Sequence, residues 1–595
     1  MNITLEHELG AIGRAAWDAL VAADEHASAM QGWAWQVAWW ETFRREPGFT
    51  REAWLVAARD AGTLVGLAPF FLERRDSDGR GTLRFIGDGM LGAEGILCAR
   101  DAAGLCTAIL DFVAEREAWS AMELSHLERG TPTAAALREL ATRRGWRDQW
   151  SSRPSVHVTS IVASAHDEAG NDASVPCVEL TEDPAQIEAL LPTLFGLHIQ
   201  DSVARGERSV FVDRRHRDLV RRFVRSGDAA RVGLASLASK GRVVACALLG
   251  AVGSRMSALV SGVDPLAPHD ARRRVAEATH ECASLRLTRS ATPDATTRVR
   301  RLATHSAPAR AIRTVADEAW RLTRVLFRGA AIVAGRRQRA AAIASHRAFY
   351  DADATTALYR RQTSLQPPER TILTELRPML RDARILDVGV GAGRTLPYFA
   401  TLGREYHAFD YAQQMVEHCR ASSDDLVQPS QIVCDDARQM RSAADAAFDF
   451  VLISYNGIDS VGAEEDRLRV LAEVRRVAAA GALFCFSSHN LQSVTPAGGT
   501  GVLERMRRWR RYLMFRAANP GLATLRRQPS AMLFDVGSEY AFAHYYITPP
   551  AQARQLESLG YRDVRVFSVE SGREVTDRAQ WTQLLDSWVY YLCRV

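Results

Sequence analysis

The second half of the chain carries the most regular pattern of hydrophobic and polar positions. Short apolar runs alternate there with longer stretches in which apolar residues recur at helical spacing. This alternation predicts buried parallel strands joined by helices, and therefore an α/β domain. The predicted strands are residues 384–388, 405–409, 431–434, 448–453 and 482–487, and the predicted helices are residues 369–380, 395–402, 412–421 and 466–478.

The first half predicts a mixed α+β fold, as one domain or as two in tandem. Residues 52–59 and 63–71 flank a turn and predict a hairpin. Residues 162–175, rich in Ala, Asp, Ser and Gly, predict a loop or a joint between subdomains. Further strands are predicted at 121–127, 230–237, 242–251 and 256–263, and helices at 102–117, 214–226 and 272–285.

An aromatic cluster lies on a predicted helix near the N-terminus. Its members are Trp33, Trp35, Trp39, Trp40 and Phe43. We interpret the cluster as a stripe that faces the core, and the alternative is one wall of a ligand groove.

Composition narrows the class of protein. A length of 595 residues predicts two or three domains, and 47% hydrophobic with 24% charged residues is typical of a soluble globular protein. The net charge of +5 is too small to indicate a nucleic-acid partner. The nine cysteines are scattered without a CxxC pair, so we expect no metal site and a reducing compartment. No signal peptide or membrane-spanning run is visible, so we expect a cytoplasmic protein, and its oligomeric state stays open.

A segment rich in arginine separates the two halves. Residues 320–339 mix arginines with apolar residues, which predicts a linker helix packed on one of the domains. The alternative is an amphipathic helix in peripheral contact with a membrane surface. We therefore predict one domain at 1–330, a linker helix at 331–345 and a second domain at 346–595, with an insertion at about 490–540.

The strongest chemical signal follows the strand at 384–388. Gly389, Gly391 and Gly393 come directly after it, and glycines at this spacing allow a tight turn and a close approach of the backbone to a ligand. Asp410 ends the next predicted strand, where a carboxylate can accept hydrogen bonds from a ribose. The pattern differs from the G-x-G-x-x-G of dinucleotide-binding enzymes.

The stretch from Ile385 to Gly393, an apolar pair, an acid and G-x-G-x-G, resembles the first motif of class I S-adenosylmethionine (SAM)-dependent methyltransferases. Residues 407–415, 433–437, 448–456 and 471–484 resemble the later motifs in the right order. The resemblance implies a Rossmann-like fold, SAM as the cofactor and no metal. It implies that the glycines admit the methionine moiety, that Asp387 orients the loop or the ligand's ammonium, and that Asp410 binds ribose. It further implies contacts near adenine or in the donor pocket from Tyr411, Met415, Asp436, Ala437, Ser454 and Asn456.

The insertion at about 490–540 is a candidate lid over an acceptor site. Its arginine run, residues 505–511, could hold the phosphates of a nucleotide sugar or lipid-linked sugar, bind nucleic acid, or form a solvated helix face. His544 follows it and is the best candidate for a general base, with Tyr545 beside it. A structural histidine is the alternative.

Residues 20–325 resemble GNAT-type acyltransferases of the branch associated with cellulose and exopolysaccharide biosynthesis, related to the FemAB aminoacyltransferases. The resemblance rests on residues 31–40, 55–71, 83–88, 211–216, 240–250, 261–265 and 300–304. It implies acyl transfer from an acyl-CoA. His216 and His269 are candidate bases for an amine acceptor, and the alternative is that they are surface histidines. The chain departs from the family at residues 266–274, where three arginines replace a turn of small residues.

Together these patterns predict a SAM-dependent methyltransferase for a small or sugar-like acceptor, with an N-terminal module that acylates or binds the same acceptor. One alternative is that the N-terminal module serves only for docking. The other is a methyltransferase that modifies nucleic acid.

Overall fold

The computed structural model describes residues 1–595 except 76–80, 89–94, 129, 153–177, 227–231, 240, 253–254, 268–270, 272–293, 301–306, 341–345, 424 and 500. The chain divides into two compact units. Unit 1 contains Met1–Ser202 and Ser209–Thr304, and unit 2 contains Val203–Arg208 and His305–Val595. The predicted domain boundaries at residues 330 and 346 both fall within unit 2.

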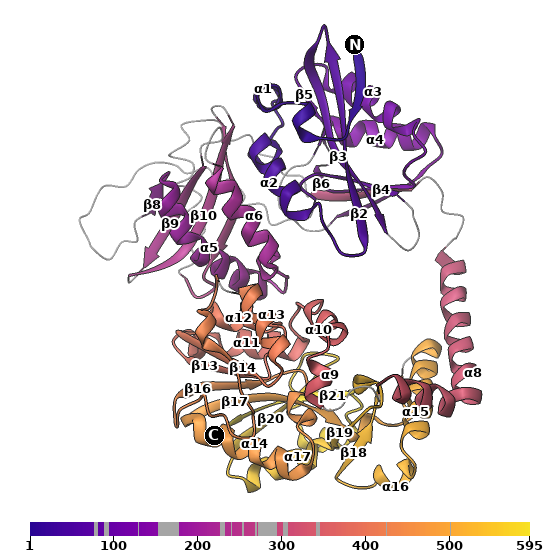
Figure 1. Cartoon of the computed structure of the whole chain (residues 1–595), viewed down its shortest axis with the longest axis vertical. Helices are drawn as coiled ribbons and strands as arrows, with labels where there is room; N and C mark the ends of the chain where they lie inside the picture. Colours follow the sequence, from indigo (N-terminus) through magenta and orange to yellow (C-terminus); the bar gives the residue numbers. More distant parts are fainter. Residues whose placement is uncertain are drawn as a thin grey trace. The chain divides into compact units, whose positions relative to one another are not determined.

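Unit 1 contains two sheets and is a mixed α and β structure (Figure 1). The larger sheet has the order β1(Asn2–Glu6), β2(Phe49–Asp60), β3(Thr63–Arg75), β4(Gly81–Phe85), β6(Ala121–Glu128), β12(Asp294–Arg300) and β7(Arg147–Ser152), with β5(Leu97–Cys98) beside β3. The smaller sheet has the order β11(Arg255–Val263), β10(Arg242–Val252), β9(Val232–Ser239) and β8(Val178–Thr181). The helices are α1(Arg14–Ala23), α2(Trp33–Phe43), α3(Ala102–Ala114), α4(Pro132–Arg143), α5(Pro184–Ala204) and α6(Arg214–Arg225).

The aromatic stripe of α2 faces the core, as predicted. Trp35, Trp39 and Phe43 are buried, and the Trp39 ring lies 5.2 Å from the Phe71 ring. His216 lies on α6 with its ring 4.9 Å from that of Phe43. His269, the helix predicted at 272–285 with its arginines, and the loop predicted at 162–175 lie outside the described residues.

Unit 2 is built on a sheet with the order β15(Ile432–Cys434), β14(Glu405–Asp410), β13(Arg384–Val388), β16(Phe448–Ile453), β17(Ala478–Asn490), β19(Ala543–Ile547) and β18(Ser530–Phe534). The first five are parallel neighbours, and these are the strands that the sequence predicts. β21(Trp588–Arg594) pairs antiparallel with β17 and β20(Arg562–Ser568). Helices α11(Pro367–Leu380), α12(Leu396–Ala400) and α13(Gln413–Ser423) cover one face, and α14(Glu464–Val477) and α17(Pro549–Ser558) cover the other (Figure 1).

The strand order of unit 2 creates a binding crevice. From β13 the chain adds β14 and β15 on one side and later β16 and β17 on the other. Loops therefore leave in opposite directions at the carboxyl ends of β13 and β16, and a crevice opens between them. Ile385, Leu386 and Val388 of β13 are almost fully buried, which fixes this strand at the centre of the Rossmann-like sheet.

A long helix, α8(Ala307–Ala340), belongs to unit 2 and lies beside α15(Val502–Ala518) (Figure 1). Val325 and Val333 pack with Met514 and Ala518 of α15. Between them Gly329 gives close approach, since a Cβ there would lie 3.6 Å from that of Ala517. The linker helix predicted at 331–345 thus overlaps the C-terminal end of α8. This helix packs on α15, which lies in the predicted insertion.

Unit 2 also contains short helices. They are α9(His346–Tyr350), α10(Asp353–Arg360) and α16(Leu522–Leu525). Over the described residues, none of the helices combines the length and apolar character needed to cross a bilayer.

Candidate active site

The glycine loop leaves the carboxyl end of β13 with a backbone that requires glycine. Gly389, Gly391 and Gly393 have φ angles of 71°, 57° and 90°, in the left-handed region that other residues adopt only under strain. A Cβ at Gly389 would meet no atom within 4 Å, so open space borders the loop. The N–H of Gly391 donates to Asp410 Oδ2 at 2.9 Å, which ties the loop to the end of β14.

Asp410 is buried at the end of β14 beside this loop. Its second oxygen, Oδ1, accepts the N–H of Ala412 at 2.9 Å. Burial raises the pKa of the carboxyl, although the N–H groups of Ala412 and Gly391 act in the opposite direction. Tyr411 follows, and its buried hydroxyl has no hydrogen-bond partner among the described residues. Met415 is buried on α13 one turn further on.

Asp387 lies beneath the loop, and one of its two carboxyl oxygens accepts hydrogen bonds. Oδ2 accepts the hydroxyls of Thr395 at 2.5 Å and Tyr406 at 2.8 Å. Oδ1 is buried and makes no hydrogen bond within the described part of the chain. Burial raises the pKa of Asp387 to about 6. A cationic group of a ligand would compensate such a carboxylate.

A buried ion pair that the sequence does not reveal supports the loop. Glu369 at the start of α11 accepts both Nη atoms of Arg394 at 2.6 Å and the Tyr590 hydroxyl at 2.7 Å. The Ser454 hydroxyl also donates to Glu369 and lies 2.6 Å from Arg394 Nη2. Burial raises the pKa of Glu369, but the charge and hydrogen bonds of Arg394 outweigh it and hold this pKa below its ordinary value. Ser454 is therefore committed to a network that holds the ends of β13 and β16 together.

Asp436 and Ala437 follow β15 at the same edge of the sheet. Asp436 accepts the backbone N–H of Arg438 at 2.9 Å and its guanidinium at 2.6 Å, and the hydrogen bonds from Arg438 lower the pKa of Asp436. Ala437 packs against the core of the domain.

A cavity of about 740 Å³ adjoins the end of β16. Tyr455 and Asn456 border it in left-handed backbone conformations, with φ angles of 52° and 61°. Tyr359, which also lines the cavity, reaches the glycine loop, since a Cβ at Gly391 would lie 3.8 Å from its ring. The remaining lining residues include Tyr350, Ser460, His489, Asp535, Gly537, Tyr540, His544, Tyr546 and Trp588.

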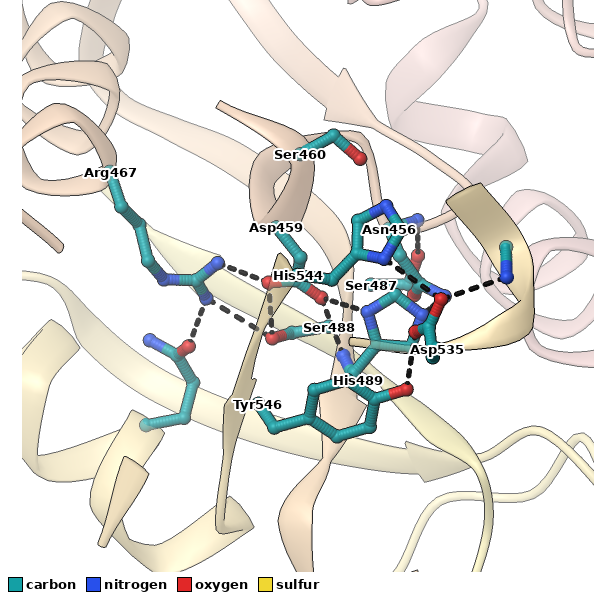
Figure 2. A network of polar contacts seen from close by, with 12 residues as sticks. Asn456, Asp459, Ser460, Arg467, Ser487, Ser488, His489, Asp535, His544 and Tyr546 are labelled. Atoms are coloured by element: carbon teal, nitrogen blue, oxygen red, sulfur yellow. Dashed lines mark hydrogen bonds and ion pairs between the residues drawn. The ribbon is translucent and has the colours of Figure 1, made fainter. Parts of the chain in front are cut away.

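His544 forms a buried pair with an acid on the wall of this cavity (Figure 2). His544 Nδ1 lies 3.0 Å from Asp535 Oδ1, and Tyr546 donates to Asp535 Oδ2 at 2.6 Å. Burial raises the pKa of Asp535, but hydrogen bonds from His544 and Tyr546 and the nearby imidazole charges hold it well below its ordinary value. An ionised Asp535 fixes the proton of His544 on Nδ1 and leaves Nε2 able to accept one.

Comparison with known protein families gives a match within unit 2. Residues 386–486 match the family model described as a methyltransferase domain. Unit 2 contains a methyltransferase domain. None of the curated proteins matches the chain.

Several solved structures are similar to the methyltransferase domain. A SAM-dependent methyltransferase from Aquifex aeolicus is 17% identical over 40% of this chain and 98% of that chain, with a TM-score of 0.25. One from Mesorhizobium loti is 16% identical over 38% and 98% of the two chains, with a TM-score of 0.26. The 1,6-didemethyltoxoflavin-N1-methyltransferase of Burkholderia thailandensis, solved with 1,6-didemethyltoxoflavin and S-adenosylhomocysteine, is 14% identical over 40% and 80%, with a TM-score of 0.25.

In the methyltransferase domain the predicted donor residues come together at one edge of the sheet. They lie at or beyond the carboxyl ends of four neighbouring strands, β13, β14, β15 and β16. Within this group, Asn456 also reaches the cavity, whereas Ser454 belongs to the Glu369 network behind it. The roles of these residues toward SAM stay predictions.

The structure brings His544 to the cavity of the methyltransferase domain and places Tyr545 elsewhere. Successive side chains of a strand point to opposite faces, so His544 and Tyr546 share one face of β19. Tyr545 lies on the other, where its hydroxyl donates to Glu464 at 3.1 Å and its ring packs near Arg467.

A second histidine on the cavity wall was missed by sequence reasoning. His489 at the end of β17 has Nδ1 2.9 Å from Asp459 Oδ2, and its ring stacks on that of Tyr546 at 4.7 Å (Figure 2). Its Nε2 lies 3.2 Å from the Asn456 amide nitrogen, so both ring nitrogens have a neighbour. The run Ser487-Ser-His-Asn490, polar residues at the end of a parallel strand, is the signal that could have found it.

Proposed function

We propose that unit 2 transfers the methyl group of SAM to an oxygen or nitrogen of a small acceptor held in the cavity beside β16. The observation that carries the proposal is the buried His544–Asp535 pair on the wall of this cavity, which Tyr359 connects to the glycine loop of the methyltransferase domain. SAM supplies an electrophilic methyl group on a sulfonium, so the protein's task is mainly to position the nucleophile and exclude water.

On the donor side the proposal rests on three features. They are the three glycines with positive φ, the Asp410 carboxyl that accepts the N–H of Gly391, and Asp387 Oδ1, which has no hydrogen-bond partner among the described residues. Together they offer a close backbone approach and negative charge, which suit the amino acid and ribose parts of SAM.

On the acceptor side His544 acts as the general base. Asp535 holds its Nδ1 proton, and among the described residues no hydrogen bond occupies Nε2. This nitrogen therefore takes the proton that the acceptor's hydroxyl or amine loses as the methyl group arrives. His489 is less suited, because the Asn456 amide faces its Nε2. Asn456 Oδ1, buried and without a partner in the described chain, orients the acceptor by accepting a hydrogen bond.

The cavity walls support a sugar-like or ring-shaped acceptor. Tyr350, Tyr359, Tyr455, Tyr546 and Trp588 present aromatic rings around it. Such rings stack on flat or sugar rings while their polar tips form hydrogen bonds. Acyl transfer or acceptor binding by unit 1, and methylation of nucleic acid as an alternative substrate, stay predictions from the sequence.

Donor binding is tested by isothermal titration of the full chain with S-adenosylhomocysteine. Loss of the Asp410 carboxylate in Asp410→Ala is expected to weaken binding by about 2 kcal/mol or more, because a buried charged hydrogen-bond acceptor is removed. Glu405→Ala is the matched control, since Glu405 is exposed at the opposite end of the same strand. Absence of binding by the wild type would refute the proposal.

Methyl transfer is tested with isotope-labelled SAM and a pool of small metabolites, read as products that gain one labelled methyl group. His544→Ala is expected to lower the rate by roughly 100-fold or more without weakening S-adenosylhomocysteine binding. Tyr545→Phe serves as the control, because its hydroxyl lies on the other face of β19. Equal loss in both variants would contradict the role of His544.

A further inference from the structure

The cavity has two chemically different sides. One group of lining residues, His544, Asp535, Tyr546 and Asn456, comes from β19 or directly follows β16 and β18. The other side consists of arginines from two helices that lie beside each other, α8 and α15. They are Arg321, Arg324, Arg507, Arg510 and Arg511.

Helical spacing explains why these arginines converge. On α15 the lining residues Arg507, Arg510, Arg511 and Met514 recur at intervals of three and four, so they share one face of the helix. Arg321 and Arg324 have the same relation on α8, followed by Val325, which anchors the helix on α15. The arginines of α15 therefore lie on different faces of the helix, and Arg507, Arg510 and Arg511 are the ones that line the cavity.

Most of this positive charge is not neutralised by the protein. Arg510 is paired with the buried Glu318 at 2.6 Å. Arg511 is held by neutral groups, the Ser493 carbonyl at 2.7 Å and the Ser587 hydroxyl. Within the described chain Arg321, Arg324 and Arg507 form no ion pair, and Asp535, the one acid among the described lining residues, is paired with His544.

Arg511 carries the clearest sign of an unmet charge. Burial lowers the pKa of its guanidinium, and the neighbouring Arg508 acts in the same direction. A bound anion would reverse both effects, because it replaces lost hydration and opposes the repulsion between the arginines.

We propose that the acceptor carries a phosphate group, which Arg321, Arg324, Arg507 and Arg511 bind while its nucleophile lies at His544. This inference rests on the proposed methyl transfer and names the substrate class. Several guanidinium groups around one site offer more donors than a carboxylate can accept, whereas the terminal oxygens of a phosphate can use them. The phosphate fixes one end of the acceptor and so directs the other end to the base.

Two kinds of molecule carry such a phosphate: a soluble phosphate ester, and a lipid at a membrane surface. Two exposed aromatic side chains of α8 are relevant to the second source, a lipid phosphate. Trp320 and Phe327 are 64% and 83% exposed, and Trp320 lies one residue before Arg321. The test therefore has one arm for each source.

The experiment uses the full chain saturated with S-adenosylhomocysteine. Inorganic pyrophosphate is the soluble probe, acetate is the carboxylate probe, and phosphatidylcholine vesicles with and without phosphatidic acid present the lipid phosphate. Pyrophosphate binding is expected in titration calorimetry, and Arg324→Gln with Arg507→Gln should weaken it by about 10- to 100-fold. Both side chains are exposed and form no ion pair with the described residues, so their replacement is expected to leave the fold intact.

The matched control is Arg328→Gln with Arg516→Gln, which removes the same charge from the same two helices outside the cavity lining. This pair is expected to leave binding unchanged. Binding to phosphatidic acid vesicles alone, with the same loss in the cavity variant, supports the proposal with a lipid as the source.

Three results would overturn the phosphate assignment: equal loss in both double variants, acetate bound as tightly as pyrophosphate, or no binding in either arm. Failure of S-adenosylhomocysteine to bind at the outset instead overturns the proposed methyl transfer, so the two failures are distinguishable.

Discussion

Asp387 makes the stability of unit 2 depend on pH in a defined direction. Burial raises its pKa to about 6 from the ordinary 3.8, against the opposing hydrogen bonds of Thr395 and Tyr406. Since the folded pKa lies above the unfolded one, this carboxyl stabilises the fold fully below about pH 3.8, and that contribution is lost as the pH rises through about 6. The complete loss corresponds to about 3 kcal/mol.

Asp387→Asn removes this titration with little change in contacts. The hydroxyls of Thr395 and Tyr406 both donate to Oδ2, so one amide oxygen can keep both bonds. The amide nitrogen takes the place of Oδ1, which has no partner among the described residues. Between about pH 5 and pH 7.5 the wild type should lose about 1.4 kcal/mol relative to the variant. For a domain of this size that is roughly 3–5 °C in Tm.

Differential scanning calorimetry of the ligand-free full chain at the two pH values measures this difference. Glu405→Gln, an exposed acid on the neighbouring strand β14, is the control and should follow the wild type. The reasoning is refuted if the Tm difference between wild type and Asp387→Asn is the same at both pH values, or if it favours the wild type at the higher one. With S-adenosylhomocysteine bound the difference should shrink, because the ligand's ammonium stabilises the ionised carboxyl.

Three further outcomes are expected. Asp535→Asn should lower methyl transfer by roughly 100-fold with unchanged S-adenosylhomocysteine affinity, because His544 loses the acid that orients it; a weakened affinity would contradict this separation of roles. Glu369→Gln should destabilise unit 2 by roughly 3–5 kcal/mol in denaturant unfolding, because it leaves the Arg394 guanidinium buried without its counter-charge; a change below 1 kcal/mol would contradict it. Gly391→Ala should cost about 1–2 kcal/mol of S-adenosylhomocysteine affinity in titration calorimetry, because its φ of 57° strains any side chain; an unchanged affinity would contradict this.

Local patterns in the sequence were sufficient to predict the parallel strands of the central sheet in unit 2. The strands of a parallel sheet are buried on both faces and read as short apolar runs, which is why residues 384–388 and 448–453 match β13 and β16. β17 extends beyond the prediction, from residue 478 to 490. Its polar end pairs with β19 and β21, and such distant partners leave no mark on the local pattern.

The grouping of the proposed donor residues could be predicted, because most of them stand at or just after strand ends in a fixed order, and their contacts with SAM stay predictions. The cavity could not, because its walls come from segments far apart in the chain. Glu369 begins an ordinary helix, and its importance depends on Arg394 and Tyr590, which the fold alone brings to it. The sequence placed Tyr545 beside His544 as a candidate and could not show that it faces away, because the register and facing of β19 are set by pairing with β17 and β18.

The position of α8 determines which fragments of this protein can work. This helix begins at Ala307, well before the point where the sequence suggests that the methyltransferase domain starts. A fragment cut at residue 346 would lose Arg321, Arg324 and Val325, and with them one wall of the cavity. It would also expose the apolar surface of α15 around Met514. Such a fragment would keep the donor loop yet lack part of the proposed acceptor site, so a test of the proposed function needs α8 as well as the domain that follows it.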